Sequence, residues 1–196
     1  MMDPAIVHVA DDDGSFARAL SRLLTAHGFA VRAFGSGTDL LAQVTPASRG
    51  CVVMDLNMPD LDGLEVQGRL AQKGVAMPIV FLTGRADIPS SVRAMRQGAA
   101  DFLEKQASET DLVAAVRRAL EADATGSALR TRFAHLTERE LEVLRHVVRG
   151  RMNKQIAADL GIHERTVKLH RSAITTKLGV RSAAELASLA RDAGLS

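Results

Sequence analysis

Acidic, hydroxyl and basic side chains follow successive apolar segments in the first part of the chain. The run Asp11–Asp13 comes directly after the first segment and Asp55 after the third, while Thr83 ends the fourth and Lys105 follows the fifth. Clustered carboxylates are costly unless a cation neutralises them, and all-oxygen ligation with an open position suits Mg²⁺. With such a cation, a carboxylate can attack phosphorus while Lys105 stabilises the phosphoryl oxygens and Thr83 hydrogen-bonds the product. These residue types predict phosphoryl transfer to an aspartate.

The elements that would position these residues alternate between short apolar segments and amphipathic helices. The apolar segments have the length and β-branched content of buried parallel strands. We expect five strands, at Ala5–Ala10, Ala30–Phe34, Cys51–Met54, Pro78–Thr83 and Ala100–Leu103. Helical spacing between them, as in Ser15–His27, predicts an α/β fold with a five-stranded, doubly wound parallel sheet. The carboxyl ends of such strands meet at one edge, which would bring the acids, Thr83 and Lys105 together.

Each of these residues has an ordinary explanation when it is taken alone. An aspartate at a strand end is more often a turn former or helix cap than a ligand. Thr83–Gly84 alone would be a plain turn, and Lys105 alone a surface lysine. Their occurrence on successive strands of one sheet is what favours a site.

The strand pattern stops after a last helix at Asp111–Ala122. Ala124–Ser127 is small, polar and without periodicity, and we interpret it as a hinge. Capping residues and glycines then bound four expected helices, at Thr137–Val148, Asn153–Leu160, Glu164–Leu178 and Ser182–Ala193. The expected organisation is an α/β domain over residues 1–122, a linker over 123–134 and a small all-α domain over 135–196.

The overall charge of +2 conceals an asymmetry between the two parts. Residues 1–124 carry 12 Lys and Arg against 16 Asp and Glu, a net charge of −4, and residues 125–196 carry 13 against 7, a net charge of +6. A basic second part favours contact with a polyanion there.

Other features favour the cytoplasm. The longest apolar stretches, such as Met77–Leu82, are too short to span a bilayer of ~30 Å. Met1–Pro4 lacks the basic patch and apolar run of a secretory signal. Cys51 is the single cysteine and cannot form an internal disulfide. We therefore expect a cytoplasmic protein with no membrane partner.

Four motifs of the first domain resemble the receiver domain of two-component response regulators, which has a flavodoxin-like fold. They are Val9–Asp13 (VADDD), Met54–Gly63 (MDLNMPDLDG), Leu82–Gly84 (LTG) and Asp101–Lys105 (DFLEK). The resemblance covers residues 5 to 122, in the usual order and spacing.

This resemblance implies a role for each matching residue. Asp55 would be the phosphoacceptor, and Asp12 a direct Mg²⁺ ligand. Asp11 would act through water or hydrogen bonds, and the backbone carbonyl of Asn57 would complete the protein ligands. Lys105 would contact the phosphoryl group. Thr83 and Phe102 would form the switch pair, with Thr83 moving to the phosphoryl group and the Phe102 ring turning inward. Asp13 is expected to cap the following helix.

One residue departs from the receiver pattern. Receivers usually carry proline after the lysine, often in a cis peptide, and Gln106 stands there in this chain. Because a cis bond to a non-proline residue costs roughly 3 kcal/mol, we expect a trans loop in which Lys105 is aimed differently. The acceptor acids are intact, so phosphorylation is still expected.

The second domain resembles the helix-turn-helix of LuxR type, and the two domains together resemble the FixJ branch of the NarL/FixJ regulators. The matching segments are Leu136–Glu140, Asn153–Ala157, Gly161–Ile162, Thr166–Arg171 and Lys177–Ser182. The resemblance implies that the helix Glu164–Leu178 enters a major groove of double-stranded DNA.

A helical wheel of this recognition helix separates a buried stripe from an exposed face. The stripe consists of Val167, His170, Ile174 and Leu178. On the other side, Lys168, Leu169 and Ser172 are expected near bases, with Arg165 near bases or phosphate. Leu169 could touch a thymine methyl group. Lys154 and Thr166 are expected to hold phosphates, and Arg171 either contacts phosphate or has a structural role.

The combined interpretation is a non-enzymatic, phosphorylation-gated transcription regulator. A sensor histidine kinase would phosphorylate Asp55, and the phosphorylated protein would bind promoter DNA as a homodimer. Three alternatives stay open. A phosphorylation-independent DNA-binding regulator is favoured only by Gln106. A metal-dependent phosphohydrolase would need an acid where Asn57 stands, two residues after Asp55, and a phosphate sink or interaction module would not need the basic helix pair.

Overall fold

The computed structural model describes residues 5–84 and 88–193, which form two compact units, Met1–Ala124 and Thr125–Ser196. The N-terminal tetrapeptide Met1–Pro4, on which the absence of a secretory signal was judged, lies outside the described residues. No helix in the described part of the chain is long and apolar enough to cross a membrane.

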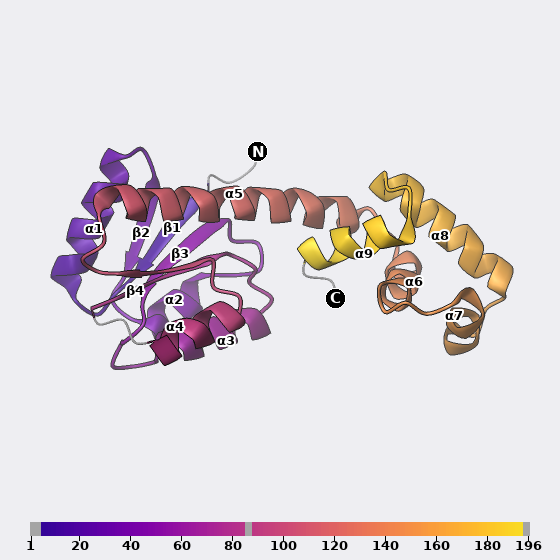
Figure 1. The fold of residues 1–196 in the computed structure, drawn as a ribbon, viewed down its shortest axis with the longest axis horizontal. Coiled ribbons are helices and arrows are strands. Elements are labelled where there is room, and N and C mark those ends of the chain that lie inside the picture. Colours follow the sequence, from indigo (N-terminus) through magenta and orange to yellow (C-terminus); the bar gives the residue numbers. More distant parts are fainter. Residues whose placement is uncertain (1–4, 85–87, 194–196) are drawn as a thin grey trace. The chain divides into compact units, whose positions relative to one another are not determined.

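The first unit is built on a sheet of five parallel strands (Figure 1). The strands are β1 (Ile6–Ala10), β2 (Ala30–Phe34), β3 (Gly50–Asp55), β4 (Ile79–Thr83) and β5 (Asp101–Glu104). They are ordered β2-β1-β3-β4-β5, with each pair parallel. Every residue of β3 and β4 is buried, which explains their continuous apolar sequences. The five-stranded parallel sheet expected from the sequence is confirmed.

Helices cover both faces of the sheet, which confirms the doubly wound architecture (Figure 1). They are α1 (Gly14–Ala26), α2 (Gly37–Gln43), α3 (Gly63–Gln72), α4 (Ile88–Arg96) and α5 (Glu109–Ala134). Residues of α1 and α5, such as Leu24 and Val116, pack on one face of the sheet. Residues of α2 and α3, such as Leu40 and Leu70, pack on the other face. The two cores hold the strands from both sides, so the strand ends are placed precisely relative to one another.

The helix expected to end at Ala122 continues to Ala134. The segment Ala124–Ser127, interpreted as a hinge from its small and polar residues, is therefore helical. A single Gly126 costs only about 1 kcal/mol in a helix interior, and no proline interrupts the segment. The helical residues on both sides outweigh that local cost, and the domain limits at 122 and 135 stay predictions.

The second unit contains the four expected short helices. They are α6 (Glu138–Val148), α7 (Asn153–Leu160), α8 (Glu164–Leu178) and α9 (Ala183–Asp192). The predicted capping box is present, with the Glu140 N–H donating to Thr137 Oγ1 and the Thr137 N–H donating to the Glu140 carboxylate. Gly161 ends α7 with a φ of 62°, a left-handed conformation that favours glycine. Val143, Ile156 and Ile174 form part of the buried core.

Glu140 is buried and joins α6 to α8. Its Oε2 atom accepts hydrogen bonds from the Thr137 N–H and from Lys177 Nζ, both at 2.7 Å. The Lys177 ammonium and the Thr137 N–H hold the pKa of the Glu140 carboxyl below its usual value. The ionised form is therefore bound more tightly in the folded protein than in the unfolded chain.

We expect Glu140→Gln to destabilise the second unit by about 2 kcal/mol at pH 7, because a charge-assisted hydrogen bond is lost. Since the folded pKa is depressed, the contribution is present above about pH 4.3 and is lost as the pH falls through the folded pKa. Hydrogen exchange measured by mass spectrometry on the full chain should show α6 and α8 exchanging about 30-fold faster in the variant. The difference between the two proteins, compared at equal pH, should shrink from pH 7 to pH 3.5. A difference that stays constant over this range would contradict the role of the carboxylate charge.

Candidate functional site

The predicted convergence of side chains at the carboxyl edge of the sheet is present. Asp11 directly follows β1, Asp55 ends β3 and Thr83 ends β4, while Lys105 follows β5. Asp11, Asp55 and Thr83 are buried, with exposed fractions of 1%, 6% and 0%. Four elements therefore deliver two buried carboxylates, a hydroxyl and an ammonium to one small region.

Lys105 bridges the two buried carboxylates. Its Nζ atom lies 2.7 Å from Asp11 Oδ2 and 2.9 Å from Asp55 Oδ2. Burial alone would lower the pKa of Lys105, but the hydrogen bonds and charges of the two carboxylates raise it above its usual value. Burial raises the pKa of the Asp11 carboxyl, and the contact with Lys105 offsets this only partly. A buried negative charge of this kind would be stabilised further by a second cation.

The loop that carries Lys105 is trans at Gln106, as the missing proline predicted. The Lys105 N–H donates to the Thr83 carbonyl at 2.7 Å, which extends the pairing of β5 with β4. The Ala107 N–H donates to the Glu104 carbonyl at 2.9 Å and closes a four-residue turn. These bonds hold the loop without a proline, and Lys105 reaches both buried acids. That its aim differs from that of a lysine followed by proline stays a prediction.

The acids have the donor set of a magnesium site. One carboxylate oxygen from each of Asp11, Asp12 and Asp55 lies within 4.8 Å of the others. Asp12 is exposed, whereas the other two are buried, so the cluster is open to solvent on one side. Hard oxygen ligands with an open side fit Mg²⁺, which keeps several waters when it binds proteins. The residues therefore fit the cation predicted from the sequence.

The loop after β3 orients the Asp55 carboxylate. The backbone N–H of Asn57 donates to Asp55 Oδ1 at 3.1 Å. The side-chain Nδ2 atom of Asn57 lies 3.5 Å from Thr83 Oγ1. This side-chain contact was missed in the sequence, where only the Asn57 backbone carbonyl was given a role. A Cβ on Gly63 would lie 2.8 Å from the Asp55 carbonyl oxygen, so glycine is required where α3 begins beneath the loop.

The residues expected to form the switch pair lie on neighbouring strands. Thr83 pairs with Glu104 in the sheet, and Phe81 pairs with Phe102. Phe102 is half-buried, and its ring centroid lies 6.3 Å from that of Phe81 at a tilt of 46°. Because Thr83 and Phe102 lie on paired strands, a movement of Thr83 would change the surroundings of Phe102 on β5.

Asp13 and Phe16 complete the surroundings of Lys105. Asp13 caps α1, as expected, and its Oδ1 accepts the N–H groups of Ser15 and Phe16 at 2.9 and 3.2 Å. These backbone bonds lower the pKa of the Asp13 carboxyl. Lys105 Nζ lies 4.5 Å from the centroid of the Phe16 ring. Sequence reasoning placed Phe16 on the apolar face of its helix, and no local signal indicated contact with the site.

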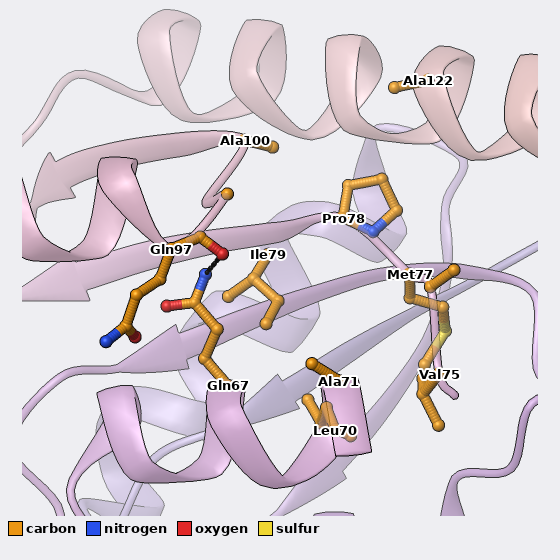
Figure 2. A pocket seen from close by; sticks show the side chains of 12 residues that line it. Gln67, Leu70, Ala71, Val75, Met77, Pro78, Ile79, Gln97, Ala100 and Ala122 are labelled. Atoms are coloured by element: carbon orange, nitrogen blue, oxygen red, sulfur yellow. Dashed lines mark hydrogen bonds between the residues drawn. The ribbon is translucent and has the colours of Figure 1, made fainter. Parts of the chain in front are cut away.

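A cavity of about 360 Å³ lies away from the carboxylates, where β4 begins beside α3 (Figure 2). Apolar side chains, including Leu70 and Ile79, line most of it. Gln67 donates from Nε2 to the Gln97 carbonyl at 3.2 Å, and its Oε1 has no partner among the described residues. None of the described residues that line this cavity has an ionisable side chain, so we place the chemistry at the carboxylates.

In the second unit, α7 and α8 form the candidate DNA-reading pair. Val167, Ile174 and Leu178 are fully buried, which confirms the predicted stripe, although His170 is only half-buried. On the other side of α8, Arg165, Lys168, Leu169 and Ser172 are exposed. Leu169 is 64% exposed, which is unusual for a large apolar side chain. The exposed face is thus the one expected to meet DNA.

The remaining predicted contact residues differ in their surroundings. Lys154 is exposed near the start of α7, and Thr166 is half-buried. Arg171 donates from Nη1 to Asn153 Oδ1 at 2.7 Å, which joins α8 to the first residue of α7. Of the two roles left open for Arg171, this contact supports the structural one. Lys168 Nζ lies 3.5 Å from Glu164 Oε1 on the same helix. This ion pair is exposed and weak, so a DNA group could take the place of Glu164 as the partner of Lys168.

Two different protein families match the two parts of this chain. Residues 7–117 match the family of response regulator receiver domains, and residues 134–190 match the LuxR family of bacterial regulatory proteins. Nodulation protein W of Bradyrhizobium diazoefficiens is 41% identical over 98% of this chain and 88% of its own length. The transcriptional regulatory protein FixJ of Azorhizobium caulinodans is 40% identical over 96% of this chain and 93% of its own length.

Solved structures give the same result. The response regulator StyR is 42% identical, with a TM-score of 0.60 over 96% of this chain and 98% of that structure. The crystal structure of FixJ-N has 38% sequence identity to this chain and a TM-score of 0.57. The match covers 61% of this chain and 96% of the FixJ-N chain.

Proposed function

This chain belongs to the NarL/FixJ family of response regulators, and we propose that a phosphoryl group on Asp55 controls its binding to promoter DNA in the cytoplasm. Its receiver and LuxR-type domains make it a transcription regulator. The observation that carries the proposal is the bridge from Lys105 to the buried Asp11 and Asp55, with Asp12 beside them.

In the proposed reaction, an Asp55 carboxylate oxygen attacks the phosphorus of a phosphohistidine on a sensor kinase. The new P–O bond forms as the P–N bond breaks, and the imidazole nitrogen keeps the bonding electron pair. Lys105, already 2.9 Å from Asp55, stabilises the charge on the phosphoryl oxygens. Asp12, Asp55 and the Asn57 carbonyl would hold Mg²⁺ directly, with Asp11 acting through water or hydrogen bonds, and the ion would supply a further positive charge to those oxygens.

Thr83 and Phe102 transmit the change in this proposal. The Thr83 hydroxyl turns to the phosphoryl group, and the half-buried Phe102 ring fills the space that opens. The switched receiver then pairs with a second copy. A dimer would place two copies of α8 about one DNA turn apart on a two-fold site.

In the DNA complex, Lys168, Leu169 and Ser172 read bases, and Arg165 contacts bases or phosphate. Lys154 and Thr166 hold phosphates. Support comes from the exposure of Arg165, Lys168, Leu169 and Ser172 on one side of a helix whose other side is core. A regulator that works without phosphorylation is the second candidate, and Gln106 is the residue that favours it.

We expect the intact 196-residue chain to gain the mass of one phosphoryl group when it is incubated with acetyl phosphate and Mg²⁺. Asp55→Asn, which keeps the shape of the side chain but removes the nucleophile, should show no adduct, and neither should the wild type in excess chelator. Intact-mass spectrometry is suited to this measurement because the chain has no Trp or Tyr for fluorescence. Absence of an adduct in the wild type would overturn the proposal and leave the phosphorylation-independent regulator.

A further inference from the structure

The ammonium of Lys105 contacts an aromatic ring as well as two carboxylates. Lys105 Nζ lies 4.5 Å from the centroid of the Phe16 ring, within the range of a cation–π contact. We infer that Phe16 is a positioning residue that holds Lys105 at the phosphorylation site, an inference that rests on the proposed function.

The backbone of Phe16 is fixed by the start of its helix. Asp13 Oδ1 accepts the Phe16 N–H at 3.2 Å and the Ser15 N–H at 2.9 Å, so the first turn of α1 is anchored directly after the acids. The ring is half-buried and packs against the core between the sheet and the layer of α1 and α5. Its position is therefore set by the fold and not by Lys105.

The ring offers a contact that does not depend on the carboxylates. An ammonium has three N–H donors, and the two carboxylates account for two of its close contacts here. A metal ion held by Asp55, with Asp11 acting through water or hydrogen bonds, would compete with Lys105 for these carboxylate oxygens. A phenyl ring is not a ligand for such a metal ion. Phe16 would therefore keep Lys105 beside Asp55 when the metal binds.

The sequence around Lys105 makes such a contact useful. Gln106 leaves the loop without the ring constraint of a proline, so one backbone hydrogen bond closes the turn and another extends the pairing of β5 with β4. These bonds fix the Lys105 backbone, but the side chain has four further rotatable bonds. The Phe16 ring restrains its far end, where the chemistry is.

The test uses three variants of the 196-residue chain. Phe16→Leu removes the ring, Phe16→Tyr keeps it, and Phe29→Leu removes another half-buried ring from the same core, which lies under Arg117 and not under Lys105. With acetyl phosphate at saturating Mg²⁺, we expect Phe16→Leu to be phosphorylated about 10-fold more slowly. Phe16→Tyr and Phe29→Leu should keep the wild-type rate.

A second readout does not require phosphorylation. In metal-free protein labelled at lysine with ¹³C, the Lys105 ε-methylene signal should be shifted upfield by the ring in the wild type and in Phe16→Tyr. The shift should be lost in Phe16→Leu and kept in Phe29→Leu. A wild-type signal at the ordinary position, or a Phe16→Leu rate equal to that of the wild type, would overturn the inference. If no protein forms an adduct but the shift follows the ring, the proposed function fails while the contact between Phe16 and Lys105 stands.

Discussion

Replacing Lys105 by methionine is expected to slow phosphorylation of Asp55 by about 100- to 1000-fold, the typical cost of removing one preorganised charge stabiliser. The variant keeps most of the side-chain volume and loses only the ammonium that lies 2.7 and 2.9 Å from the two carboxylates. The rate is measured by intact mass over time, with acetyl phosphate and saturating Mg²⁺. Lys73→Met is the matched control, because Lys73 bonds to backbone carbonyls of α2 and its end and lies outside the acidic cluster.

The same variant should reveal how the acids depend on a cation. Without Lys105, the buried Asp11 and Asp55 carboxylates repel each other, and breaking a buried ion pair costs about 3–5 kcal/mol. Mg²⁺ should therefore raise the melting temperature of Lys105→Met more than that of the wild type or of Lys73→Met. Two results would contradict the role assigned to this lysine. One is phosphorylation of Lys105→Met at the wild-type rate, and the other is an equal rise in melting temperature with Mg²⁺ for all three proteins.

Lys168→Ala is expected to weaken binding to a selected DNA duplex by about 10- to 100-fold and to relax sequence preference, because a good base contact contributes ~1–3 kcal/mol of discrimination. The duplex is one that the wild-type chain selects from a random pool, and a scrambled duplex serves as reference. Lys154→Ala removes one positive charge near the start of α7, as Lys168→Ala does on α8. This variant should instead weaken binding to both duplexes equally. It should also reduce the slope of log affinity against log salt by about 0.9.

Leu169 provides an independent arm of this experiment. If its exposed side chain touches a thymine methyl group, uracil in place of thymine should weaken binding by the wild type but not by Leu169→Ala. Arg145→Ala on α6 removes an equal charge from an exposed position and should change neither slope nor preference. Unchanged binding by both Lys168→Ala and Ser172→Ala would show that the exposed face of α8 does not read DNA.

Much of the fold follows from local patterns in the sequence. The strands were predicted to within one residue at every end because buried parallel strands are short, apolar and bounded by turn residues. The helices of the second unit were predicted as well, and the box at Thr137 and Glu140 marks the start of α6. The end of α5 was not, because the small residues of Ala124–Ser127 suit a hinge and a helix almost equally. Only the neighbouring helical residues decide between them.

The sequence by itself determined the types of the reacting groups and the edge of the sheet where they meet. Strand order along the chain is enough for that, since every parallel strand ends at the same edge. Only the tertiary structure decided which atoms touch. Lys105 bridges Asp11 and Asp55, Asn57 reaches Thr83, Phe16 lies against the ammonium and Arg171 bonds to Asn153. These contacts join residues on different elements, and their distances depend on how both sides of the sheet and the helix pair are packed. No periodicity within a single segment contains that information.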